Sequence, residues 1–245
     1  LRYVRRENGE LRIGALATHR DVASSPETAT AAPLLVQALR YVGHPAIRNR
    51  GTVCGSVAHA DPAAELPAVA ACLEATVRVA GPSGRRTIGA RELFTAAMTT
   101  QVEADELLES ISFPLARAGE GFGFAELARR HGDFALAGVA VRVRTGAEAT
   151  ADLTAFGISD TPVTREVTAL LTEALAADGA HTPESELVDR LRPGTEALAD
   201  EIVQTGGDSH GSTGYRRRLV SALAARELAR AYRRAMDGST ERSSA

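Results

Sequence analysis

Two turn signals, each lying between runs of alternating apolar and polar residues, constrain the fold of this chain more than any other feature. The first is Asn8-Gly9 within LRYVRRENGELRIGA, and the second is GPSG at residues 81–84 within ATVRVAGPSGRRTIGA. Asn-Gly adopts positive φ at little cost, and turns of this kind join neighbouring antiparallel strands. The sequence therefore predicts two β-hairpins in its first half.

Helical spacing and capping residues occur between the hairpins. Thr18 followed by Asp21 is typical of a helix start, and apolar runs predict helices over residues 33–42 and 65–73. Residues 107–113 read as a strand closed by Pro114. The mixture predicts a first domain of the α+β class.

The small-residue segment ARAGEGFG, which begins at Ala116, is the candidate boundary between two domains. After it we expect a strand over residues 133–145, a second strand around 151–159, and helices from Thr164 onward. We assign residues 1–117 to the first domain, 118–236 to a small domain of sheet and helices, and 237–245 to a disordered tail.

The composition excludes several classes of function. The 28 basic residues, all of them arginine, against 31 acidic residues leave a net charge of −3, so we expect no binding to nucleic acid. The lack of lysine excludes Schiff-base chemistry, and two cysteines cannot build an iron–sulfur cluster or a cysteine zinc site alone. Since no apolar run is long enough to span a membrane, we expect a cytoplasmic protein without a metal site.

One segment, IRNRGTVCGSVAHADPAAEL, concentrates the groups that a dinucleotide needs. Glycines let the backbone approach a ligand, hydroxyls donate to phosphate, and carboxylates accept from sugar hydroxyls. The residues concerned are Gly51, Thr52, Gly55, Ser56, Asp61 and Glu65. The segment does not match the GxGxxG pattern, so by spacing alone it could equally be a glycine-serine loop ahead of a core helix.

Several other polar residues have more than one interpretation. Cys54 is either a reactive thiol or a small buried residue, and we interpret it as the latter. His59 could contact a ligand, cap a helix or lie on the surface. His131 and Asp133 could form an acid–base pair, but we interpret RRHGDF as a turn entering a strand. We predict no catalytic residue.

The segment IRNRGTVCGSVAHADPAAELPAV resembles the second flavin-binding segment of the medium, FAD-binding subunits of molybdenum hydroxylases. This family includes carbon monoxide dehydrogenase medium subunits and xanthine dehydrogenase FAD subunits. Four further stretches agree in the same order: LRIGALATHRDV, FTAAMTT followed by ELLESISFPL, LARRHGDFALAGVAV and GYRRRLVSALAARELARA. The resemblance implies an FAD-binding fold of the vanillyl-alcohol-oxidase type, here its second part, followed by a C-terminal domain of antiparallel sheet and helices.

The resemblance also implies site residues. The family's Thr/Ser-x-Gly-Gly-Ser/Asn loop lies against the FAD pyrophosphate and flavin, and Glu65 matches an acidic residue that binds ribityl or ribose hydroxyls. Asp61 is a second polar candidate, Leu108 matches a position whose backbone reaches the flavin, and Glu126 lies near another contact position. The expected cofactor-binding set is Gly51, Thr52, Val53, Cys54, Gly55, Ser56, Asp61, Glu65 and Leu108.

The implied function is that of an oxidoreductase subunit which carries FAD and transfers electrons. Its partners would be a small subunit with [2Fe–2S] clusters and a large subunit with molybdopterin, in a dimer of heterotrimers. Electrons would leave the flavin to NAD, a quinone or oxygen. The alternatives are a flavin-free structural subunit or remnant of the same family, and a stand-alone nucleotide-binding module.

The sequence departs from the family pattern in two ways. The family's other flavin loop, of the Ala-Gly-Gly-x-Ser kind, does not occur here, so we expect a chain that lacks its N-terminal segment. Cys54 stands at the first glycine of the glycine pair, where positive φ would disfavour a side chain.

Overall fold

The computed structural model describes residues 1–147, 149–176 and 182–243. Its first half contains a five-stranded antiparallel sheet in the order β1-β2-β7-β3-β4. The strands are β1 (Val4–Glu7), β2 (Glu10–Gly14), β3 (Thr76–Gly81), β4 (Gly84–Gly89) and β7 (Leu107–Pro114). Both predicted hairpins are confirmed, and Asn8 and Gly9 have the expected positive φ.

Short helices fill the connections of this sheet. They are α1 (His19–Ala23), α2 (Pro26–Ala31), α3 (Pro33–Leu39), α4 (Pro45–Arg48), α5 (Val53–His59), α6 (Glu65–Cys72) and α7 (Ala90–Leu93), with a small ribbon of β5 (Phe94–Ala96) and β6 (Thr99–Thr100). The predicted capping box at Thr18 and Asp21 is confirmed. Every residue of α6 is buried, so this helix forms the centre of the molecule.

In its described residues the second half contains a four-stranded antiparallel sheet in the order β11-β10-β9-β8, followed by three helices. These elements are β8 (Glu120–Ala128), β9 (Ala135–Arg144), β10 (Thr150–Phe156), β11 (Val163–Glu166), α8 (Thr168–Leu175), α9 (Glu184–Ile202) and α10 (Thr213–Ser243). The α+β class with antiparallel sheets is therefore confirmed. The boundary near residue 117 falls between the two sheets and stays a prediction.

Four details of the second half differ from expectation. Strand β8 includes part of the segment expected as a bridge, and β11 lies where we expected helix. Helix α9 continues through Pro193, where the sequence suggested separate helical stretches over residues 183–191 and 195–203, and α10 extends to Ser243 over residues expected to form a tail. Residues 177–178, at the end of a helix expected from Thr164, and residues 244–245 of the expected tail lie outside the described residues.

The glycines of β8 explain why it reads as a bridge in the sequence. A Cβ at Gly121 would lie 1.9 Å from the Ala231 carbonyl oxygen, and one at Gly123 would lie 2.6 Å from the Glu227 carbonyl oxygen. These glycines therefore allow the backbone of α10 to pack directly on the strand. In the sequence these glycines suggest a loop, but in the structure they are needed for the close packing of β8 against the distant helix α10.

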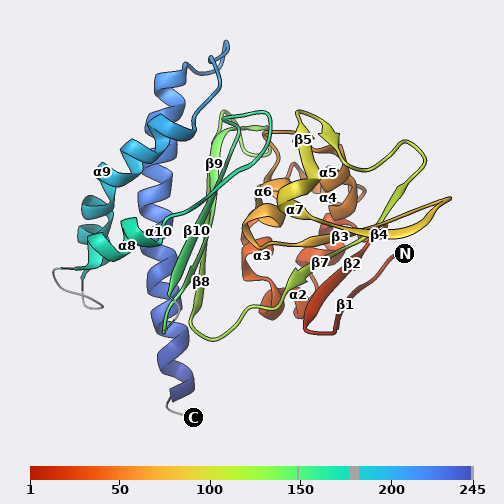
Figure 1. Cartoon of the computed structure of the whole chain (residues 1–245), viewed down its shortest axis with the longest axis horizontal. Helices are drawn as coiled ribbons and strands as arrows, with labels where there is room; N and C mark the ends of the chain where they lie inside the picture. The colour runs from red at the N-terminus through yellow and green to blue at the C-terminus, as the bar shows by residue number, and fades with distance from the viewer. Residues whose placement is uncertain (148, 177–181, 244–245) are drawn as a thin grey trace.

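The four-stranded sheet is covered on both faces. Figure 1 shows α8, α9 and α10 on one side of this sheet, and α3 and α6 on the other side, toward the five-stranded sheet. Small and aliphatic side chains such as Val139, Val141 and Leu153 pack toward α9 and α10, whereas Phe124 and Phe156 pack into the core of the first half. The alternation of side chains along each strand thus serves two different cores.

An ion-pair network connects the four-stranded sheet to the first half of the chain, on the sheet face opposite α9 and α10. Arg142 of β9 lies opposite Asp152 of β10, and its Nη2 lies 3.0 Å from Asp152 Oδ2 and 2.7 Å from Glu74 Oε2. Arg91 contacts the same two carboxylates at 3.3 and 3.5 Å. The Arg142 side chain is only 3% exposed and that of Asp152 12%, so this guanidinium compensates a buried carboxylate, whereas Glu74 is half exposed.

We expect Arg142→Ala to lower the free energy of unfolding by about 3 kcal/mol, because it leaves Asp152 buried without its principal cation. Urea unfolding followed by circular dichroism measures this change. The control is Arg165→Ala, which breaks an exposed pair with Glu201 and should cost less than about 1 kcal/mol. Equal costs for the two variants would contradict the prediction.

Candidate functional site

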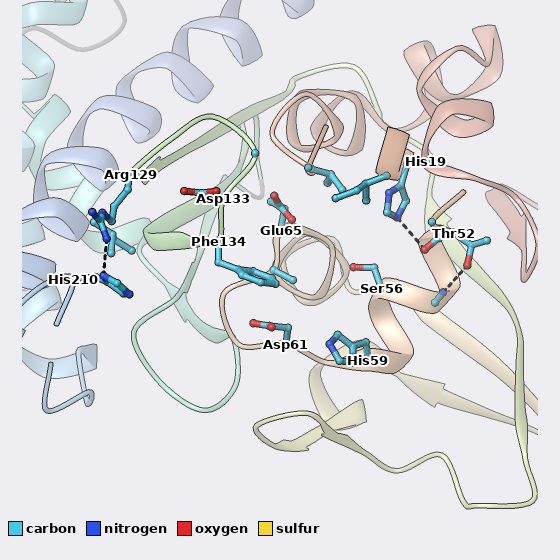
Figure 2. A pocket seen from close by; sticks show the side chains of 18 residues that line it. His19, Thr52, Ser56, His59, Asp61, Glu65, Arg129, Asp133, Phe134 and His210 are labelled. Carbon is cyan, nitrogen blue, oxygen red and sulfur yellow. Dashed lines mark hydrogen bonds between the residues drawn. The ribbon is translucent and has the colours of Figure 1, made fainter. Parts of the chain in front are cut away.

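A cavity of about 750 Å³ lies where the two halves of the chain meet beside α5 and α6. Figure 2 shows side chains from both halves around it, with Thr52 and Ser56 on one side and Arg129 and His210 on the other. This volume is typical of sites for small molecules and cofactors. The cavity is therefore the candidate binding site.

The segment predicted as a phosphate-binding turn is the first turn of helix α5. Thr52 is its N-cap, and the Thr52 hydroxyl accepts a hydrogen bond from the Gly55 N–H at 2.9 Å. Gly55 and Ser56 lie on the side of the helix that lines the cavity. The helix start therefore presents a glycine and a hydroxyl to a ligand, although it is not the open loop that we expected.

His19 supports this helix start from behind. Its Nε2 lies 2.9 Å from the Thr52 carbonyl oxygen, and burial lowers the pKa of the imidazole. The ring is consequently neutral, with Nε2–H donating to that carbonyl. Its Nδ1 is buried without a hydrogen-bond partner in the described structure, and His19 is one of the residues lining the cavity.

Cys54 points away from the cavity. Its side chain is buried in the core, and its Sγ lies 3.7 Å from the Ile13 carbonyl oxygen. The residue is helical, so the positive φ expected from the glycine pair does not arise. Burial raises the pKa of the thiol to about 12, which agrees with the interpretation of Cys54 as a small core residue.

Two carboxylates lie at the inner side of the cavity. Asp61 Oδ1 accepts a hydrogen bond from the Ala63 N–H at 2.8 Å, which holds the turn before α6. Glu65 is the first residue of α6 and is only 9% exposed. Burial, with a smaller contribution from Asp61, raises the pKa of Glu65 to about 7. Glu65 is thus a carboxyl that can be protonated near neutral pH.

The structure brings together most of the predicted site residues. Those that line the cavity are Gly51, Thr52, Gly55, Ser56, Asp61 and Glu65. Val53, Cys54 and Leu108 have side chains in the hydrophobic core and are not among the lining residues. Their backbone contacts with a cofactor remain a prediction.

Sequence reasoning missed several residues that line the cavity, including its wall opposite α5. The additional lining residues are His19, Val42, Gly43, Ile47, Ala64, Arg129, Gly132, Phe134, Leu136 and His210. Phe134, in the loop between β8 and β9, is 67% exposed although it is a large apolar side chain. Arg129 of this loop has Nη1 3.0 Å from His210 Nδ1. The additional lining residues come from segments that are distant in sequence, near residues 19, 42–47, 64, 129–136 and 210, so no local motif could join them.

The RRHGDF segment is the turn that we expected, and Gly132 fits it closely against the residues that precede α4. Gly132 has φ +85°, and a Cβ there would lie 3.0 Å from His44 Cε1 and 3.1 Å from the Gly43 carbonyl oxygen. Asp133 lines the cavity, whereas His131 does not. His131 and Asp133 therefore do not form an acid–base pair at this site.

His59 also lines the cavity, so a contact between its side chain and a ligand remains a prediction.

Among the described residues, no helix is long and apolar enough to cross a membrane. The same residues contain no group of three or more His, Cys, Asp and Glu side chains arranged to hold a metal ion.

Comparison with known proteins defines the class of this chain. Residues 1–116 match the FAD-binding domain of molybdopterin dehydrogenases. The chain is 36% identical to the nicotine 6-hydroxylase medium subunit of Paenarthrobacter nicotinovorans, over 90% of this chain and 75% of that protein. It is 30% identical to the carbon monoxide dehydrogenase medium chain of Afipia carboxidovorans, over 95% of this chain and 78% of that protein.

Solved structures agree with this class. The chain superposes on carbon monoxide dehydrogenase from Oligotropha carboxidovorans with a TM-score of 0.81 and 28% identity, covering 96% of this chain and 79% of that one. For quinoline 2-oxidoreductase from Pseudomonas putida the TM-score is 0.79, with 30% identity over 97% of this chain and 79% of that one. The chain belongs to the family of FAD-binding medium subunits of molybdenum hydroxylases, which are oxidoreductases.

We expect both cysteines to be unreactive in the folded chain, because Cys54 and Cys72 are buried and burial raises the pKa of each thiol to about 12. A maleimide reagent at neutral pH should label neither thiol in the native protein. In urea the same reagent should label both, which is the control. Rapid labelling of native Cys54 would show that its thiol faces the cavity.

Proposed function

We propose that this chain is the flavoprotein subunit of a molybdenum hydroxylase and that it holds FAD in the cavity between its two halves. The observation that carries this proposal is the position of the FAD-binding domain's polar groups. Ser56, Asp61 and Glu65 line one cavity of cofactor size instead of being scattered over the surface. The family match to an FAD-binding domain supports the identity of the cofactor.

The residues of the cavity fit such a cofactor. Gly55 gives the start of α5 an open backbone beside the Ser56 hydroxyl, which suits close approach of a phosphate or sugar group. His19 Nδ1 is a buried acceptor without a protein partner, and a ligand donor would satisfy it. Ile47 and Phe134 are large exposed apolar side chains that a planar ring would cover.

The protein's own contribution would be binding, orientation and exclusion of water. Bound FAD would supply the exchange between one-electron and two-electron transfer, which the side chains of this chain do not provide. The neutral His19 ring would hold the α5 backbone in position by its hydrogen bond to the Thr52 carbonyl. Phe134 and Ile47 would close the cavity mouth over the ligand.

We further propose that the electrons come from an iron–sulfur subunit and ultimately from a molybdenum subunit, and that they leave to NAD, a quinone or oxygen. The support is that relatives are named as medium chains or subunits, which indicates multi-subunit enzymes. The same relatives are named for substrates as different as nicotine and carbon monoxide. Substrate choice is therefore expected to belong to another subunit.

We expect the purified chain, alone or co-expressed with its partner subunits, to bind FAD and to be yellow. Phe134→Ala should raise the FAD dissociation constant about tenfold, because an aromatic contact is worth on the order of 1 kcal/mol or more when buried against a ring. Fluorescence titration of FAD measures this change.

Leu107→Ala is the matched control for that titration, since Leu107 is also exposed but does not line the cavity. It should leave the dissociation constant unchanged. A colourless protein that takes up no FAD, with or without partner subunits, would refute the proposal and favour a structural subunit.

A further inference from the structure

Arg216 is a buried arginine in the first turns of α10. It is the first of three consecutive arginines, but it alone lies on the helix face that continues with Val220 and Leu223, which are buried one and two turns later. Arg217 is half-buried and Arg218 is exposed. Arg216 is only 6% exposed, and a charge so deeply buried needs hydrogen-bond acceptors inside the protein.

The Arg216 guanidinium finds these acceptors on three separate segments of the chain. Its Nη1 donates to the backbone carbonyls of Leu136 and Gly157, the latter at 2.7 Å, and its Nη2 lies 2.6 Å from Asp208 Oδ2. The three partners belong to the start of β9, the turn after β10, and the loop between α9 and α10. A guanidinium can serve them together because its N–H groups diverge in a rigid, planar fork.

Each of these segments leads to residues that line the cavity. Leu136 lines it directly and follows Phe134 by two residues. Figure 2 shows Phe134, Asp61 and His210 around the cavity on three different segments. Arg216 is not among the lining residues, so its influence on a ligand would pass through these neighbours.

Gly157 connects Arg216 to the turn that carries Asp61. The Gly157 N–H donates to the Pro62 carbonyl at 2.8 Å, while the Gly157 carbonyl accepts from Arg216. Gly157 has φ +74°, and a Cβ there would lie 3.0 Å from the Ala135 carbonyl oxygen. A glycine is therefore needed for this link between Arg216 and the turn before α6.

Asp208 connects Arg216 to the loop that carries His210. Its Oδ1 accepts hydrogen bonds from the backbone N–H groups of His210 at 2.8 Å and Gly211 at 3.0 Å. The hydrogen bond from His210 is the largest of the causes that lower the pKa of Asp208, so this carboxylate is ionised at neutral pH. The loop that brings His210 to Arg129 is thus fixed to the buried guanidinium.

We propose that Arg216 is a positioning residue of the cofactor site, which holds the β9 start, the Gly157 turn and the Asp208 loop in one arrangement around the cavity. A ligand that fills the cavity would contact residues of all these segments, so tight binding requires that their relative positions are set beforehand. Lysine cannot replace this group, because its ammonium is a single point charge on a flexible stem. The part of this inference that concerns the cofactor rests on the proposed function.

Hydrogen exchange of the chain without ligand, followed residue by residue by NMR, tests whether Arg216 joins the three segments. We expect Arg216→Lys to speed exchange of the Gly157, His210 and Gly211 amides about tenfold or more, because their hydrogen bonds open more often. Arg142→Lys is the matched control, since Arg142 is as deeply buried but bonds to none of these segments, and it should leave the three amides unchanged. Unchanged exchange in Arg216→Lys would overturn the proposal.

Titration with FAD tests the positioning role. We expect Arg216→Lys to raise the FAD dissociation constant about tenfold and to alter the visible circular dichroism of the bound flavin, which depends on its surroundings. Arg142→Lys should leave both quantities unchanged although it also disturbs a buried arginine. If Arg216→Lys binds FAD with an unchanged constant and spectrum, Arg216 has only a structural role and the positioning proposal is refuted.

Asp208→Ala keeps the proposal testable if Arg216→Lys does not fold. The Asp208 side chain is half-exposed, so its removal breaks one of the three links without opening the core. We expect faster exchange at His210 and Gly211 and a rise of about threefold in the FAD dissociation constant. Asp200→Ala, which breaks the exposed pair of Asp200 with Arg217, is the matched control and should change neither. Equal behaviour of the two variants would overturn the proposal.

The two proposals fail in different ways. If the unmodified chain binds no FAD, the proposed function fails, and hydrogen exchange still decides whether Arg216 joins the three segments. If FAD binds and exchange in the Arg216 and Asp208 variants matches that of the unmodified chain, the cofactor proposal stands and the role of Arg216 does not.

Discussion

The four-stranded sheet is buried on both faces, and its two faces meet chemically different partners. On one face Gly121 and Gly123 let the backbone of α10 lie directly on β8. On the other face Phe124 and Phe156 join the core of the first half of the chain. Because strand side chains alternate, strands β8, β9 and β10 each contribute side chains to both cores. This two-sided burial holds the halves of the molecule together.

The face of the sheet toward the first half of the chain also carries charged groups. Arg142 of β9 pairs there with the buried Asp152 of β10 and with the half-exposed Glu74. Glu126 follows Phe122 and Phe124 along β8, and its Oε2 is buried without a hydrogen-bond partner in the described structure. This face thus contains a compensated ion-pair network and an unpaired carboxyl oxygen.

Local features of the fold could be predicted because their causes are local. Asn8-Gly9 makes a hairpin turn, and Thr18 with Asp21 makes a capping box, whatever surrounds them. The errors fall where a distant segment decides. Strand β8 resembles a glycine-rich bridge until α10 packs on it, and β11 becomes a strand because β10 offers it an edge. Helix α9 tolerates Pro193 at an exposed position near its middle.

The sequence by itself determined the hairpins, the helix starts, the α+β class and the family, because each is carried by neighbouring residues or by motifs in a fixed order. It also identified Ser56, Asp61 and Glu65 as one polar cluster. Only the tertiary structure decided which of these neighbours face the cavity. The helical turn of α5 directs Cys54 into the core and Gly55 toward the cavity, and chain folding brings Phe134 to the same cavity. The helical or strand repeat fixes the directions of side chains relative to one another within one element, whereas packing between elements decides which neighbours each side chain contacts.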